Sequence, residues 1–98
     1  KTITTGLNNS FFGYACGDGT DDGARNTAVG AGAISANAAD DNTAVGYEAL
    51  KVVTGSDNTA VGMQSGVSLT SGASNTLMGI MSGDALTDGS SYVWLKSY

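Results

Sequence analysis

The sequence is dominated by a five-residue phrase, Asn-Thr-Ala-Val-Gly, that recurs at almost constant spacing. Identical copies begin at Asn26, Asn42 and Asn58, and a variant with Leu and Met in place of Ala and Val begins at Asn75. The segment that begins at Asn9 fits the same template, so the asparagines step by 17, 16, 16 and 17 residues. A fixed period of this kind indicates a repeat protein, whose function comes from an extended surface rather than a single pocket.

The length of the period selects the architecture. It is too short for a helix–turn–helix repeat, which needs about 33 residues, and for a propeller blade of about 40. It fits one coil of a small solenoid with two short strands and two tight corners, because Thr and Val favour strands and the flanking glycines allow corners. The sequence therefore predicts an all-β fold, a short β-solenoid (β-roll) of five coils of 16–17 residues plus a degenerate sixth.

This solenoid is expected to form a single domain over residues 1–98. A further step of 17 residues from Asn75 reaches Tyr92, and Val93, Trp94 and Leu95 stand where the next strand should be. A Gly or Ala lies three residues before each of these positions. Coils are therefore expected to begin near Gly6, Gly23, Ala39, Gly55, Gly72 and Gly89.

Side chains alternate between the two faces of a strand, so each phrase presents three columns. The column that is apolar in every coil is expected inside, together with the Thr column two residues earlier. The column between them is then expected outside: Phe11, Ala28, Ala44, Ala60, Leu77 and Trp94. The inward columns would be Phe12, Val29, Val45, Val61, Met78 and Leu95, with Ser10, Thr27, Thr43, Thr59, Thr76 and Val93.

The asparagine column is interpreted as structural. Stacked amides at a corner can hydrogen-bond to the next coil and to the turn backbone, as asparagine ladders do in stacked-strand assemblies. We therefore expect Asn9, Asn26, Asn42, Asn58 and Asn75 to hold neighbouring coils together.

The charge balance argues against two classes of partner. The formal net charge is −5, and the basic residues Lys1, Arg25, Lys51 and Lys96 are scattered. Nucleic acids and anionic membranes are bound through clusters of Lys and Arg, so neither is expected as a partner. No apolar run approaches the roughly 20 residues that cross a bilayer, so no membrane insertion is expected either.

The residue types that carry catalysis are scarce. The chain has no His, so a Ser or Cys nucleophile would lack its usual base. A non-enzymatic protein without a cofactor is expected. The single cysteine, Cys16, excludes an internal disulfide and is expected to be a small buried residue, with an intermolecular disulfide as the alternative.

Two acidic segments are weak candidates for a cation, although no metal site is expected. The Gly-rich stretch 17–23 carries oxygen ligands but lacks the spacing of known calcium loops, so a solvated corner is favoured. Asp41 and Asp57 occupy equivalent positions in consecutive coils and should repel each other across about 5 Å. Arg25, one coil earlier in the same column, can relieve Asp41, and a cation could do the same.

The repeat at residues 42–50, with Thr54 and Gly55 leading into the next Asn, resembles repeats of phage tail-fibre proteins and large bacterial surface proteins. It is also similar to the β-roll heads of trimeric autotransporter adhesins. The resemblance covers about residues 6–89. It implies a fibrous module that is extracellular, on a cell surface or on a virion surface, and it does not identify a ligand.

The favoured function is therefore structural: self-association into, or a segment of, such a fibre. Both ends of a solenoid expose a strand edge, and this chain has no Pro to block one and large apolar residues at the ends. The partner would be another copy of the chain, in a homo-oligomer or filament. The residues expected to carry self-association are Phe11, Ala28, Ala44, Ala60, Leu77, Tyr92, Trp94 and Tyr98.

Two alternatives stay open. One is a recognition module of an adhesin or tail fibre that binds a surface glycan or a protein receptor through exposed aromatic residues. Tyr14 and Tyr47 share a column with Ala31, Met63 and Ile80, which is more typical of packing than of glycan binding. The other is ice binding, which needs regular outward Thr arrays. The predicted inward Thr column counts against it.

Overall fold

The computed structural model describes residues 7–20 and 22–96, and these form an all-β solenoid. Gly6, the expected start of the first coil, lies outside the described residues. Each coil contributes one three-residue strand to a common wall, and no helix occurs in the described part of the chain. The strands are β1 (Ser10–Phe12), β2 (Thr27–Val29), β3 (Thr43–Val45), β4 (Thr59–Val61), β5 (Thr76–Met78) and β6 (Val93–Leu95).

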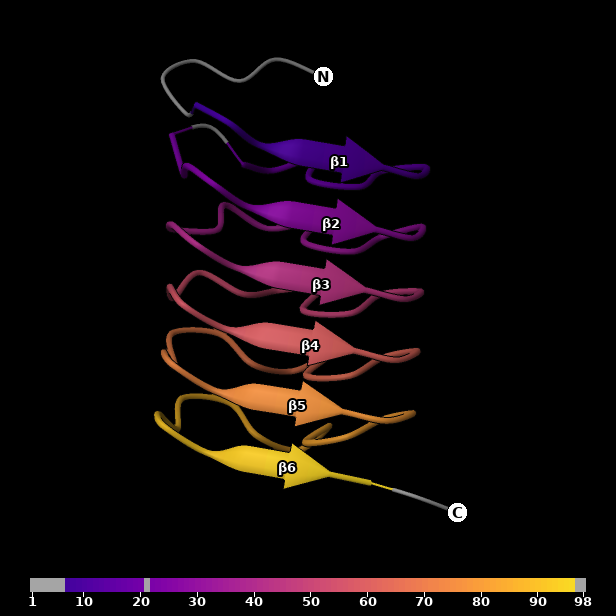
Figure 1. Cartoon of the computed structure of the whole chain (residues 1–98), viewed down its shortest axis with the longest axis vertical. Helices are drawn as coiled ribbons and strands as arrows, with labels where there is room; N and C mark the ends of the chain where they lie inside the picture. Colours follow the sequence, from indigo (N-terminus) through magenta and orange to yellow (C-terminus); the bar gives the residue numbers. More distant parts are fainter. Residues whose placement is uncertain (1–6, 21, 97–98) are drawn as a thin grey trace.

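The six strands form one parallel sheet in chain order, each paired with the next (Figure 1). Successive paired residues are 17, 16, 16, 17 and 17 positions apart, as in Ser10 with Thr27 and Thr27 with Thr43. Equivalent positions of the repeat therefore lie in register along the sheet. The five coils and degenerate sixth predicted from the sequence are confirmed.

The expectation of two strands per coil is wrong for the described residues. The chain returns behind the sheet in turns, and several residues there adopt left-handed φ values, including Glu48 (56°), Leu50 (50°) and Gln64 (56°). Left-handed residues break the extended conformation that a second strand needs. Backbone hydrogen bonds still join the coils on this side, as from Leu50 N–H to the Ser65 carbonyl at 3.0 Å.

The predicted facing of the strand side chains is also wrong. Ala44 is fully buried, whereas the next residue, Val45, is 36% exposed. The interior between the two walls is narrow, so it takes the smallest side chain of the phrase, while Thr and Val retain their preference for strand on the outside. The buried strand residues are Ala28, Ala44, Ala60 and Leu77, all at 0% exposure.

The asparagine ladder predicted from the sequence is confirmed. Asn42 is fully buried, and its Oδ1 accepts a hydrogen bond from Asn58 N–H at 3.0 Å, while its Nδ2 donates to the Gly55 carbonyl at 2.8 Å. The same pattern runs from Asn9 to the end of the stack, where Tyr92 N–H donates to Asn75 Oδ1 at 2.9 Å. Because the ladder comes directly before each strand, it fixes the register of the sheet.

Candidate functional site

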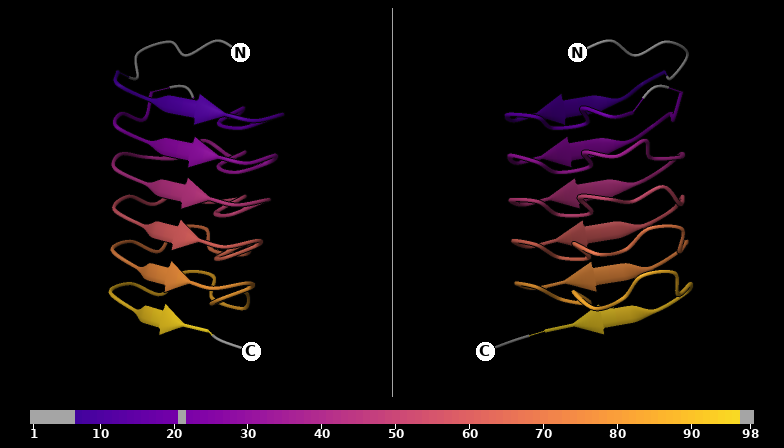
Figure 2. Two further views of the ribbon diagram at one scale, coloured as in Figure 1. Left: turned by 45° about the vertical axis from the view of Figure 1, so that its right-hand side comes forward. Right: turned by 180° about the vertical axis from the view of Figure 1, so that it is seen from behind.

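The outer side of the sheet is the most regular surface of the molecule. Each strand from β2 to β5 points its first and third side chains outward and its middle side chain inward. No charged residue occurs in these strands, and Figures 1 and 2 show the connecting segments on the other side of the sheet. We call this surface the strand face; it comprises Thr27, Thr43, Thr59 and Thr76 with Val29, Val45, Val61 and Met78.

A second surface lies at the corner where each strand ends. Gly46 ends β3 with φ at 134°, a conformation that L side chains rarely adopt, and the chain then turns at Tyr47. The residue after the glycine points to solvent: Tyr14 is 87% exposed, Tyr47 52% and Ile80 54%. We call this column the apolar ridge; it comprises Tyr14, Ala31, Tyr47, Met63 and Ile80.

The exposure of the ridge differs from the packing role that sequence reasoning favoured for Tyr14 and Tyr47. The signal that could have located it is the repeated Gly, since a corner directs the following side chain away from the interior.

A polar pair bounds the ridge on its far side. Gln64 Nε2 donates to Glu48 Oε1 at 2.9 Å, and Lys51 Nζ lies 3.1 Å from Glu48 Oε2. The hydrogen bond from Gln64 is the main reason that the pKa of Glu48 lies below its ordinary value, followed by that from Lys51. These groups satisfy the carboxylate within the protein, so the ridge beside it is left as an apolar strip.

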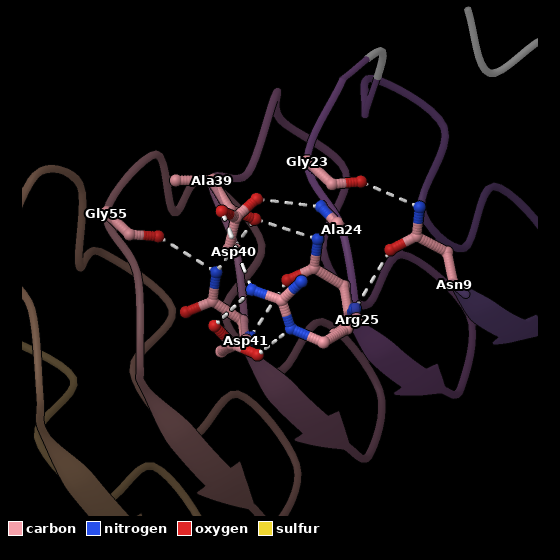
Figure 3. A network of polar contacts seen from close by, with 10 residues as sticks. Asn9, Gly23, Ala24, Arg25, Ala39, Asp40, Asp41 and Gly55 are labelled. Atoms are coloured by element: carbon pink, nitrogen blue, oxygen red, sulfur yellow. Dashed lines mark hydrogen bonds and ion pairs between the residues drawn. The ribbon is translucent and has the colours of Figure 1, made fainter. Parts of the chain in front are cut away.

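The acidic corner contains an ion pair that the sequence predicted (Figure 3). Arg25 Nε donates to Asp41 Oδ1 at 2.7 Å and Nη2 donates to Asp41 Oδ2 at 2.9 Å, across one coil. Asp40 also lies near the guanidinium, at 3.8 Å, and its Oδ1 accepts a hydrogen bond from Ala24 N–H at 2.9 Å. The hydrogen bond from Arg25 holds the pKa of Asp41 below its ordinary value.

This arrangement leaves little for a cation to bind. Both oxygens of Asp41 already contact Arg25, and Asp57 follows in the same left-handed column. Among the described residues, no three His, Cys, Asp or Glu side chains cluster closely enough to hold a metal. Of the acidic stretch 17–23, Asp21 lies outside the described residues.

Cys16 is buried, as expected for a small interior residue. Its Sγ donates to the Ala28 carbonyl at 3.1 Å, and burial raises the pKa of the thiol. A protonated, buried thiol is a poor nucleophile.

The residues expected to carry self-association fall into two groups. The outward placement of Ala28, Ala44, Ala60 and Leu77 is wrong, because all four lie in the interior. Phe11 and Trp94 extend the same inward column at its two ends. Phe11 is half-buried against the core, and Trp94 is 42% exposed because the described chain places no coil beyond it. Tyr92 is also half-exposed, and Tyr98 lies outside the described residues.

A shallow open hollow lies beside the end of the sheet, lined by Met78, Gly79, Leu95 and Lys96. These residues include no nucleophile with a base and no pair of carboxylates, so the hollow offers no general acid–base chemistry of the usual kind.

Comparison with known proteins adds no relative. No family model, no curated protein and no solved structure matches the chain. Within residues 7–20 and 22–96, no helix is long and apolar enough to cross a membrane. The functional argument therefore rests on the surfaces described above.

Proposed function

We propose that this protein is a non-enzymatic structural module that self-associates side by side, as part of an extracellular, cell-surface or virion-surface fibre. The observation that supports this function is the apolar ridge. Its large side chains Tyr14, Tyr47, Met63 and Ile80 are each more than 40% exposed and lie in consecutive or alternate coils of one column. Contiguous exposed apolar surface of this kind is typical of protein–protein contacts.

A second copy of the chain is the partner that suits the ridge. Neighbouring ridge residues are separated by the rise of one coil, about 4.8 Å. Another copy has the same rise, so its side chains can fit between those of the first along the whole length. An unrelated globular surface lacks this period and can match only one or two positions.

The resemblance of the repeat to phage tail-fibre proteins and to adhesin heads supports the fibre. Every coil added to such a solenoid lengthens the ridge without changing the contact. The association then strengthens with the number of coils, as expected for linked binding units. A fold that repeats one coil is therefore suited to building long structures from a weak contact.

Sedimentation velocity and light scattering test this function. The wild-type chain is expected to form an oligomer that dissociates on dilution. The double variant Tyr47→Lys/Ile80→Lys places two charges on the ridge and is expected to be monomeric, because charge is excluded from the centre of an interface. A matched control, Thr54→Lys/Thr87→Lys, puts the same charges on exposed residues of the same two coils in the segments behind the sheet.

The control is expected to keep the oligomer. A wild-type chain that stays monomeric at millimolar concentration would contradict the proposal. So would an oligomer that survives both ridge substitutions while circular dichroism shows the fold unchanged.

The alternative function, recognition of a surface glycan or a protein receptor, is favoured by one observation. Tyr14 presents 87% of its surface to solvent and Tyr47 52%, which leaves their rings free to stack on a sugar. A glycan array probed with the monomeric variant Ile80→Lys separates the two functions, because this variant keeps both tyrosines. Binding by this monomer that is lost in Tyr14→Ala/Tyr47→Ala would favour recognition over assembly.

A further inference from the structure

We infer that the strand face is an ice-binding surface. The inference uses a surface other than the apolar ridge and does not depend on self-association. It starts from the corrected facing of the strands. The Thr column of the repeat, with Thr27, Thr43, Thr59 and Thr76, lies on the outside of a sheet that nothing in the described chain covers (Figure 1).

The strand face is a two-dimensional lattice. The strands are parallel and in register, so the Thr and Val columns run straight across β2, β3, β4 and β5. Along each column the repeat is the strand separation of about 4.8 Å, and between the columns it is two residues, about 6.7 Å. The first of these spacings lies close to the repeat of the oxygen rows on the prism faces of hexagonal ice.

The chemistry of this lattice suits solid water. Each coil offers one hydroxyl and the methyl groups of Thr and Val, so water can be anchored by hydrogen bonds and also ordered around apolar groups. Within the described part of the chain, the hydroxyls of Thr27, Thr43, Thr59 and Thr76 make no hydrogen bond to the protein. They are therefore available to water.

The distribution of charge points to a neutral occupant. The chain carries a net charge of −5, yet its acidic residues all lie outside the strands. A surface that avoids charge in so acidic a protein is mismatched to a cationic or anionic partner. Charged side chains also hold water in orientations that differ from those in ice.

The lattice is held rigidly. Each Thr of the face follows a fully buried asparagine, such as Asn42 before Thr43, and that amide is bonded to the next coil. The β-branched Thr and Val side chains are themselves stiff at χ1. A rigid array keeps its spacing without a loss of conformational entropy on binding.

Other occupants fit the strand face less well. It contains no aromatic residue in β2, β3, β4 or β5, so it lacks the anchors that usually dominate protein contacts and sugar stacking. The flat part ends at Phe12 in β1 and at Leu95 in β6, which are both 75% exposed and larger than their neighbours. The proposed ice contact therefore spans the middle four strands.

Three chains measured at equal concentration on a single ice crystal test this site. The wild type is expected to separate the freezing from the melting temperature and to shape the crystal into facets. Thr43→Lys/Thr59→Lys introduces two charges at the centre of the strand face and is expected to lose both effects. Thr54→Lys/Thr87→Lys carries the same charges behind the sheet and is expected to retain them.

A milder variant covers the case in which the lysines disturb the fold. Thr43→Val/Thr59→Val removes only the hydroxyls, keeps the strand preference and is expected to lower the temperature gap without abolishing it. Circular dichroism and melting temperature report folding in each chain. A wild type without a temperature gap or faceting would overturn the inference, and so would equal activity in all the folded variants.

The ridge variant distinguishes this inference from the proposed assembly. Tyr47→Lys/Ile80→Lys is expected to keep its ice activity, whether or not the wild type self-associates. Loss of ice activity in this variant would place the contact on the ridge and overturn the inference. A wild-type oligomer that Thr43→Lys/Thr59→Lys converts to monomers would show that the strand face joins copies of the chain, and would overturn it too.

Discussion

The strand wall and the wall behind it solve the same stacking problem in different ways. The strand wall repeats Thr-Ala-Val without change in β2, β3 and β4. The opposite wall varies in both length and residue type, since coils of 16 and 17 residues alternate with the same strand spacing. Regular pairing is therefore confined to one wall, and the other wall adjusts to it.

The two walls nevertheless share one interior, and their side chains compensate in size. A Cβ on Gly17 would overlap the ring of Phe11, six residues earlier in the same coil. In coils where the strand contributes Ala, the equivalent position six residues later can hold a large residue, as Leu50 does after Ala44. The pairs in chain order are Phe11 with Gly17, Ala28 with Ile34, Ala44 with Leu50, Ala60 with Gly66 and Leu77 with Gly83.

This comparison teaches that volume, rather than hydrophobicity alone, decides what the strand places inside. Gly66 is small although Ala60 is small too, and the side chains of Leu50 and Leu77 from the coils on either side approach it. Compensation thus extends between coils as well as within one.

The largest expected effect comes from a charge on one face or the other of a single strand. Ala44→Asp buries a carboxylate in an interior with no basic partner among the described residues, and the chain is expected not to fold. Val45→Asp, one residue later, faces solvent and is expected to fold with a stability change below about 1 kcal/mol. Far-UV circular dichroism and urea unfolding measure both, and the reverse sensitivity would contradict the observed facing.

A smaller effect tests the sharing of volume between the walls. Ala44→Leu overpacks a coil that already contains Leu50, and is expected to cost about 1–3 kcal/mol of unfolding free energy. Leu50→Gly alone leaves a cavity but removes a left-handed φ of 50° from a residue with a side chain. The double variant reproduces the arrangement of Leu77 with Gly83, so it is expected to be more stable than Ala44→Leu.

Urea denaturation of the four chains gives the coupling between the two sites. The expected coupling is favourable and at least about 1 kcal/mol, as for residues that share a cavity. Strictly additive effects would show that the two walls pack independently.

The sequence predicted the parts of this fold that depend on spacing. The period of the asparagines predicted the number of coils, the register of the sheet and the ladder through Asn42 and Asn58. Even the pair of Arg25 with Asp41 followed from equal positions in neighbouring coils. Spacing is visible in a sequence because it depends on the chain alone.

The facing of the strands could not be read in the same way. Val looked like the core residue because it is more apolar than Ala, but a narrow interior has no room for it in every coil. The matched sizes of Phe11 with Gly17 and Leu77 with Gly83 were the available signal. The error mattered for function, because it placed the Thr column inside and the tyrosines of the ridge among packed residues.

The smallest expected effect lies at the exposed corner where the two walls meet. Arg25 and Asp41 join the first two coils there, and the hydrogen bond from Arg25 lowers the pKa of Asp41. A carboxyl whose pKa is lowered by folding stabilises the protein above its ordinary pKa of 3.8, and that contribution is lost as the pH falls through the folded value. Because both groups are exposed to solvent, the contribution should be small.

Carbon-detected NMR titration of Asp41 measures this shift. In the wild type its midpoint is expected below the ordinary value, and in Arg25→Gln it is expected to return toward that value. The melting temperatures of the two chains should differ slightly at pH 6 and converge in acid, where Asp41 is protonated in both. A normal midpoint in the wild type would show that the ion pair does not persist in solution. A large difference in melting temperature would show that this corner stabilises the stack, which the buried ladder and the shared interior are otherwise expected to do.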